Sequence, residues 1–159
     1  MKLHCFCPDL TEEQFDNMDL TEIDLSGRSF YISKMPMVSH FPMNPEIKIQ
    51  KTLKEIEEKG YRTVSPLFVL FEDGLLMGNI MIEIVKPPAK DSNIKTFNKL
   101  RLISKAYKGP KHLVPKALKQ FDGYLILKQI ITADFFFWYH SCKVCEKQKG
   151  GRTIILAKI

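Results

Sequence analysis

The segment RLISKAY (residues 101–107) repeats a pattern that occurs earlier in the chain, in FYISKMP (residues 30–36). The two segments share Ile-Ser-Lys, and each has the composition of a short apolar β-strand. Each is followed by a turn with proline and then by a helical pattern. The repetition predicts a duplicated structural unit.

The helix expected after the first copy has clear start signals. Asn44 is a candidate N-cap residue, and Pro45 fits the first helical position. Ile49, Leu53 and Ile56 then recur on one helical face, with Lys and Glu on the other. The pattern predicts an amphipathic helix that packs on a sheet.

The helix expected after the second copy begins near Pro115. Its apolar face would consist of Leu118, Phe121 and Leu125. Gly123 weakens the pattern, so the sequence does not define where this helix ends.

Each helix leads to two further strands. In the first half these are PLFVLFED (66–73) and GNIMIEIV (78–85). In the second half they are DFFFWYHS (134–141) and RTIILAKI (152–159), joined by CKVCEKQKGG (142–151), which we expect to be a loop. The order strand–helix–strand–strand therefore occurs twice, which predicts an α+β fold.

We expect one domain over residues 1–159, built from two pseudo-symmetric modules at residues 26–86 and 94–159. Residues 86–93, with two prolines, would link the modules. Residues 1–25 would form an N-terminal extension, either a short helix or an edge element. The modules can pair into one antiparallel sheet with both helices on one face, which leaves a ligand groove on the other.

Composition and charge exclude several classes of protein. The hydrophobic fraction of 45% and charged fraction of 26% are those of a globular domain, and no apolar run is long enough to cross a membrane. The N-terminus turns acidic too early for a signal peptide, so we expect a cytoplasmic location. The net charge of +6 comes from lysines spread over the chain without a nucleic-acid-binding motif. We therefore expect a solvated basic surface and no nucleic-acid partner.

The duplicated chain resembles the GyrI-like family of small-molecule-binding domains, in its stand-alone type. The matching segments are EIEEKGYRTVSPLFVLFED (55–73) and LISKAYKGPKHLVPKALKQFDGYL (102–125), together with the glycine-led strands GNIMIEIV (78–85) and GRTIILAKI (151–159). The resemblance covers residues 26–159. It implies two modules, an antiparallel sheet, helices on one face and a ligand groove on the other.

The resemblance leaves several functions open. Family members include drug-binding domains of transcription regulators, DNA gyrase inhibitors, and hydrolases that open the cyclopropane ring of DNA-alkylating natural products. The first hypothesis for this chain is therefore a protein that binds a hydrophobic or aromatic, toxic or cationic compound. The alternatives are such a hydrolase and a gyrase inhibitor with a protein partner. Members often carry a glutamate in the last strand that binds cationic drugs, and RTIILAKI (152–159) has none.

Glu83 is the principal candidate for chemistry. In NIMIEIV (79–85) the isoleucines would pack on the helices, and Met81 and Glu83 would face the groove. The carboxylate could bind a cation or act as a general acid or base on a strained electrophile, with Tyr139 as a second catalytic candidate. A solvated glutamate on an exposed strand is the alternative.

The aromatic residues are candidates for the walls of the groove. We expect Tyr31, Phe68, Met81, Phe137 and Trp138 to contact the ligand, since flat rings stack on planar or cationic compounds. Strand alternation alone does not indicate which face of residues 134–140 is open.

The four cysteines have no assigned role. Cys142 and Cys145 form a Cys-x-x-Cys pair without a following histidine, which excludes covalent heme attachment, and their expected loop position argues against thioredoxin-like chemistry. Zinc would require further ligands from Cys5, Cys7 or His4, so its binding stays open and we assign no metal or cofactor.

His140 could act as an acid or base at neutral pH. No serine or cysteine nucleophile stands at a recognisable motif distance from it. We expect a structural histidine at the end of a strand, with its ring nitrogens hydrogen-bonded.

Overall fold

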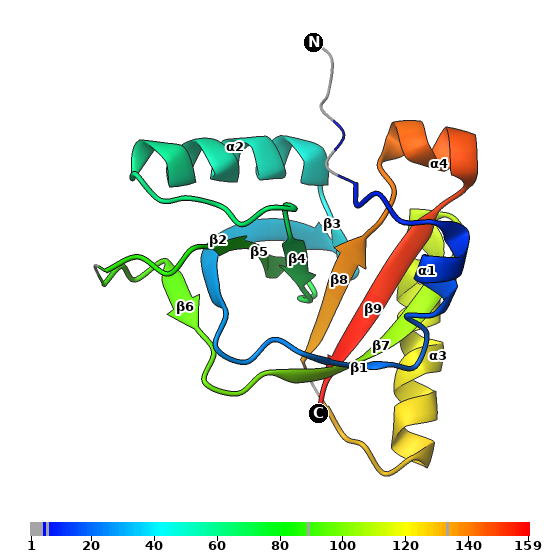
Figure 1. Cartoon of the computed structure of the whole chain (residues 1–159). Helices are drawn as coiled ribbons and strands as arrows, with labels where there is room; N and C mark the ends of the chain where they lie inside the picture. The colour runs from blue at the N-terminus through cyan, green and yellow to red at the C-terminus, as the bar shows by residue number, and fades with distance from the viewer. Residues whose placement is uncertain (1–4, 6, 89, 133) are drawn as a thin grey trace.

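The computed structural model describes residue 5 and residues 7–88, 90–132 and 134–159. Across these residues the chain forms a nine-stranded antiparallel sheet and four α-helices (Figure 1), which confirms the α+β class. The strands are β1 (Glu22–Asp24), β2 (Ser29–Val38), β3 (Phe41–Pro42), β4 (Val69–Glu72), β5 (Met77–Ile84), β6 (Ile94–Thr96), β7 (Arg101–Lys108), β8 (Phe135–Tyr139) and β9 (Arg152–Lys158). The helices are α1 (Glu12–Asp16), α2 (Pro45–Glu58), α3 (Val114–Leu127) and α4 (Lys143–Lys149), with a 3-10 turn η1 (Lys111–Leu113) before α3.

The sheet is assembled from two groups of strands. Its order is β1-β7-β9-β8-β4-β5-β2-β3, and β6 also pairs with β2. Strands β2, β5 and β4 come from the first half of the chain, and β8, β9 and β7 come from the second. The groups meet where β4 pairs with β8, with Phe71 opposite Phe137 and Glu72 opposite Phe136. The short β4–β8 pairing therefore joins the two groups of strands, and β6 of the second half also pairs with β2 of the first.

Helix α2 begins where the sequence predicts, but its cap differs. Pro45 is the first helical residue, and Ile49 and Ile56 are buried against the sheet. Asn44 occupies the N-cap position with φ 48° and makes no side-chain cap hydrogen bond. A capping side chain needs an extended backbone to reach the first helical N–H groups, and the left-handed conformation of Asn44 prevents this.

Helix α3 packs on the same face of the sheet as α2. Leu118, Phe121 and Leu125 are buried in one cluster with Ile49 and Ile56 of α2. Within the described part of the chain, no helix is both long and apolar enough to cross a membrane. Because residues of α2 and α3 share one buried cluster, both helices lie on one face of the sheet.

The N-terminal segment covers part of the other face. Thr11 and Gln14 form a reciprocal capping box that starts α1, and Phe15 of α1 is fully buried. Strand β1 pairs with the edge of β7, with Ile23 opposite Leu102. The N-terminal extension thus supplies both a short helix and an edge strand, which the sequence left as alternatives.

The connection between β8 and β9 contains a helix, so its prediction as a loop is wrong. Helix α4 spans Lys143–Lys149, and Cys142 is its N-cap residue. The Cys-x-x-Cys pair therefore stands at a helix start after a strand, the position that the sequence analysis had argued against. Figure 1 shows α4 close to the N-terminal segment.

His140 is buried on the face of the sheet that the N-terminal segment covers, with 6% of its surface exposed. Its ring centroid lies 4.2 Å from that of Trp138 and 5.4 Å from that of Phe15. Neither ring nitrogen has a hydrogen-bond partner among the described residues, contrary to our expectation. Burial first, and the charge of Arg152 second, lower the pKa of His140 from 6.5 to about 4.

We expect the free energy of unfolding to fall as the pH is lowered from 6.5 towards 4. In this window the unfolded chain binds a proton at His140 that the folded chain excludes, so acid favours unfolding. The loss should reach about 3 kcal/mol, at about 1.4 kcal/mol per pKa unit. Urea unfolding of the wild type and His140→Phe over this pH range measures it.

The difference between these two proteins isolates His140, because groups such as Asp73 titrate in both. The wild type should lose stability in acid more steeply than His140→Phe. Parallel curves for the two proteins would contradict the prediction.

Candidate functional site

Glu83 lies on β5, on the face of the sheet away from α2 and α3. Ile80 and Ile82 belong to the apolar cluster under the helices, whereas Met81 belongs to the cluster on the opposite face. Glu83 alternates with these isoleucines and is only 6% exposed. The period of two therefore places a buried carboxylate on the face without the long helices.

Arg28 is the charged partner of Glu83. Its Nε donates a hydrogen bond to Glu83 Oε2 at 2.7 Å, and its Nη2 donates to Oε1. The guanidinium also lies over the Phe68 ring, 5.0 Å from its centroid. A two-pronged pair of this kind compensates the burial of the carboxylate and restricts its orientation.

A cavity of about 860 Å³ opens beside this pair. Its sheet side includes Glu83, Phe68 and Trp138, and its outer side is formed by the N-terminal segment from Cys7 to Leu10. The lining is mostly apolar, with Arg28 and Glu83 among its charged groups. Volume and lining both fit a drug-sized organic molecule.

Aromatic rings form a continuous wall next to the carboxylate. Phe68 and Trp138 meet edge to face with centroids 4.8 Å apart. The Trp138 ring also packs against His140, and this contact restricts the orientation of the indole. This wall can hold a flat ligand beside Glu83.

The structure brings together three of the seven predicted site residues. Glu83, Phe68 and Trp138 line the same cavity. Met81 is on the same face but is fully buried below the lining. The remaining three residues, Tyr31, Phe137 and Tyr139, pack in the cluster on the helix face.

Strand alternation explains the separation within β8. Trp138 faces the Glu83 cavity, so its neighbours Phe137 and Tyr139 must point to the opposite face. Residues 137, 138 and 139 alternate between the two faces of the sheet, so they cannot all line one groove. The structure thus does not place Tyr139 where it could act together with Glu83.

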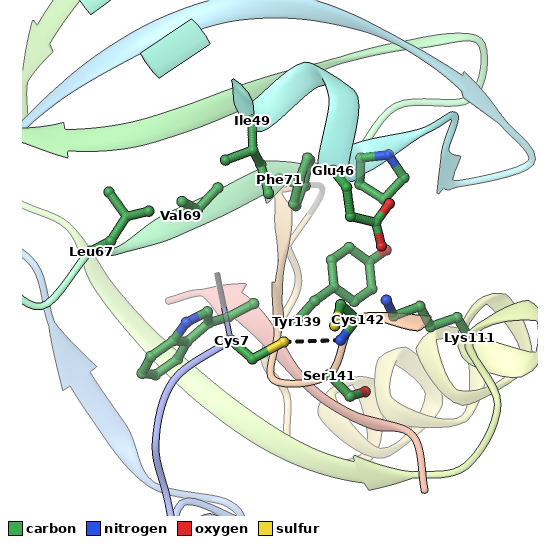
Figure 2. Close-up of a pocket in the computed structure, with 12 residues that line it drawn as sticks. Cys7, Glu46, Ile49, Leu67, Val69, Phe71, Lys111, Tyr139, Ser141 and Cys142 are labelled. Atoms are coloured by element: carbon green, nitrogen blue, oxygen red, sulfur yellow. Dashed lines mark hydrogen bonds between the residues drawn. The ribbon is translucent and has the colours of Figure 1, made fainter. Parts of the chain in front are cut away.

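Tyr139 instead lines a small cavity of about 40 Å³ between α2 and the sheet (Figure 2). Its ring packs against Phe71, and its buried hydroxyl has no hydrogen-bond partner among the described residues. Burial raises the pKa of Tyr139, so the hydroxyl stays protonated. The volume admits a water molecule but no aromatic ligand.

Tyr31 belongs to a polar network under α2. Its hydroxyl donates to Glu55 Oε2 at 3.2 Å and accepts from Asn93 Nδ2 at 3.1 Å. Lys59 lies over its ring. The two hydrogen bonds use the Tyr31 hydroxyl, which we expected to contact a ligand.

The four cysteines come together at the edge of the Glu83 cavity. Their sulfur atoms all lie within 4.8 Å of one another. Cys7 accepts a hydrogen bond from the backbone N–H of Cys142 at 2.9 Å, drawn as a dashed line in Figure 2. His4, the other ligand considered from the sequence, lies outside the described residues. The cluster is therefore the candidate metal-binding group of the described chain.

Sequence reasoning missed Arg28 and the N-terminal segment as parts of the site. One signal was available for Arg28. It precedes β2, whose Phe30 would sit opposite Glu83 once the two strands are paired. A buried acid needs a cationic partner, and Arg28 is two residues from that pairing position. No local pattern indicates that residues 7–10 fold back over the sheet.

The fold is similar to that of solved structures. The C-terminal domain of EcmrR superposes with a TM-score of 0.65 at 11% sequence identity, covering 87% of this chain and 94% of that domain. A protein described as a bacterial transcription regulation protein from Staphylococcus aureus MU50 matches with a TM-score of 0.48 at 12% identity, covering 87% of this chain and 95% of that one. The first match shows the GyrI-like fold, as the sequence resemblance implied.

A search of curated proteins found no match. The model of one protein family, described as bacterial hydrolase, matches residues 2–159. Because this match extends over nearly the whole sequence, the chain belongs to the bacterial hydrolase family.

Proposed function

We propose that this protein is a cytoplasmic enzyme that hydrolyses a hydrophobic, electrophilic small molecule bound in the Glu83 cavity. The observation that carries the proposal is the buried Glu83 carboxylate, held by Arg28 and facing a cavity walled by Phe68 and Trp138. The family and the fold support it, since the family is described as hydrolases and the fold is that of small-molecule-binding domains.

Two matching modules would form this cavity. Counted from Gly78 and Gly151, Leu156 holds in β9 the place that Glu83 holds in β5, and both residues line the cavity. Equivalent positions of the two modules therefore supply one acid and one apolar contact. The carboxylate that related domains carry in the last strand would be replaced here by the one in the first module.

Glu83 would act on water. Its carboxylate accepts a proton from a water molecule as the water oxygen attacks the electrophilic carbon. Arg28 keeps the carboxylate oriented, and the aromatic wall holds the carbon at a fixed position relative to the water. Glu83 then returns the proton to the atom that receives the electron pair of the broken bond.

A cyclopropane fused to a conjugated carbonyl system fits this chemistry. Water oxygen bonds to a ring carbon, the strained C–C bond breaks, and its electron pair moves into the conjugated system. The proton from water ends on that system, so the sum is the addition of one water. A planar, apolar alkylating compound of this class also suits the aromatic wall.

Sequestration without turnover is the second candidate. The Phe68–Trp138 wall supports it, because ring stacking can hold a planar compound without any chemical step. The two functions differ at Glu83, which turnover requires and stacking does not.

Glu83→Gln should reduce hydrolysis of a cyclopropane-containing DNA alkylator by roughly 10²–10⁴-fold, because the amide cannot accept the proton from water. Binding should persist. Mass spectrometry of the product, heavier by one water, measures turnover. Fluorescence of Trp138, the protein's single tryptophan, measures occupancy of the cavity.

Glu22→Gln is the matched control. Glu22 pairs with Arg101 in an exposed ion pair outside the cavity lining. This variant should retain wild-type turnover. Equal turnover by wild type and Glu83→Gln would refute the catalytic role, and a wild type that binds one equivalent without product would favour sequestration.

Trp138→Ala should weaken binding of the same compound by roughly fivefold, since the lost aromatic contact amounts to about 1 kcal/mol. Tyr139→Phe should leave the affinity unchanged, because Tyr139 faces the helix side of β8. Isothermal titration calorimetry in the non-hydrolysing Glu83→Gln background measures both. Equal effects of the two substitutions would place the ligand elsewhere.

A further inference from the structure

The cysteine cluster joins two parts of the chain that are far apart in sequence. Cys5 and Cys7 come from the N-terminal segment, and Cys142 and Cys145 come from the start of α4. These are all four cysteines of the protein. Their convergence therefore uses every thiol that the chain has.

The sulfur positions match a tetrahedral thiolate site. Cys5 Sγ lies 3.6 Å from Cys145 Sγ and 3.8 Å from Cys142 Sγ. Four thiolates around Zn²⁺, each at about 2.3 Å, are separated by roughly 3.8 Å along the edges of the tetrahedron. The sulfurs would need to move little to bind one ion.

The arrangement does not favour one disulfide pair. A disulfide requires a distance of about 2.05 Å between one pair of sulfurs. Cys5 is nearly equidistant from Cys142 and Cys145, so it has two equivalent partners. A shared centre explains this geometry better than a pairwise bond.

A backbone hydrogen bond to one of the sulfur atoms also fits a metal site. The backbone N–H of Cys142 points at Cys7 Sγ at 2.9 Å, as expected for a donor to a thiolate ligand. A divalent cation at the centre of the four sulfur atoms would favour the thiolate form that binds metal.

We propose that Cys5, Cys7, Cys142 and Cys145 bind one structural zinc ion. Four protein ligands fill the tetrahedron, so no position stays open for catalysis. The ion would tie the N-terminal segment to α4. Because Cys5, Cys7 and Pro8 also line the Glu83 cavity, the zinc site would hold that wall in place.

The test is the metal content of the full-length protein, produced in zinc-containing medium and measured by elemental mass spectrometry. We expect about one zinc per chain in the wild type. The Cys5→Ser/Cys7→Ser and Cys142→Ser/Cys145→Ser double variants should each lose it. Lys147→Ser, at an exposed position of α4, is the matched control and should retain zinc.

Two measurements on the wild type avoid reliance on variants that fail to fold. A thiol reagent should react slowly with the holoprotein and with four thiols after a chelator is added. Cobalt added to the stripped protein should give the visible absorption of tetrahedral thiolate coordination. Amide exchange of residues 7–10 should become faster after zinc removal, and zinc should restore it.

Several outcomes would overturn the proposal. These are metal-free protein with four thiols that react at once, fewer than four thiols in unreduced protein, and iron in place of zinc. Loss of zinc from the Lys147→Ser control would show that the assay reports folding rather than coordination. None of these readouts depends on hydrolysis, so the zinc proposal is tested independently of the proposed enzyme activity.

Discussion

The pairing of β4 with β8 is the interaction on which the architecture depends. Two residue pairs, Phe71 with Phe137 and Glu72 with Phe136, join the strands of the first half to those of the second. Because alternation continues across this pairing, each face of the joint sheet receives side chains from both halves. The helix face collects the isoleucines of β5, and the other face collects Glu83 and Trp138. Without this register the acid and the aromatic wall would not share a cavity.

Much of this could be predicted from local patterns. Periodicity located α2, α3 and the main strands, and alternation in β5 correctly separated Glu83 from its isoleucine neighbours. The same rule could not orient β8, because both of its faces are apolar and the sequence offers no polar residue to mark the open side. Asn44 shows another limit, since residue type indicates where a helix begins but not the backbone conformation that capping requires.

The features that sequence reasoning missed depend on contacts between distant residues. A buried carboxylate is costly unless it is paired, so the burial of Glu83 requires a partner, but only strand pairing identifies Arg28 as that partner. The sequence does not indicate helix α4 either, because its formation also depends on contacts with a distant segment. A seven-residue helix has little intrinsic stability in water, and its lysine-rich sequence reads equally well as a loop. Its contact with the N-terminal segment has no counterpart in the local sequence.

The N-terminal segment then determines what kind of site the exposed face becomes. A bare sheet face would leave Glu83 in water, where a carboxylate is an ordinary solvated base and ring stacking contributes little. Phe15 and Leu25 bury apolar surface over that face, and residues 7–10 close the cavity from outside. A carboxylate in such a mostly apolar enclosure interacts more strongly with bound water and with Arg28 than it would in bulk solvent. The core of the sheet therefore supplies the floor of the site, and the N-terminal segment supplies the enclosure that the proposed hydrolysis needs.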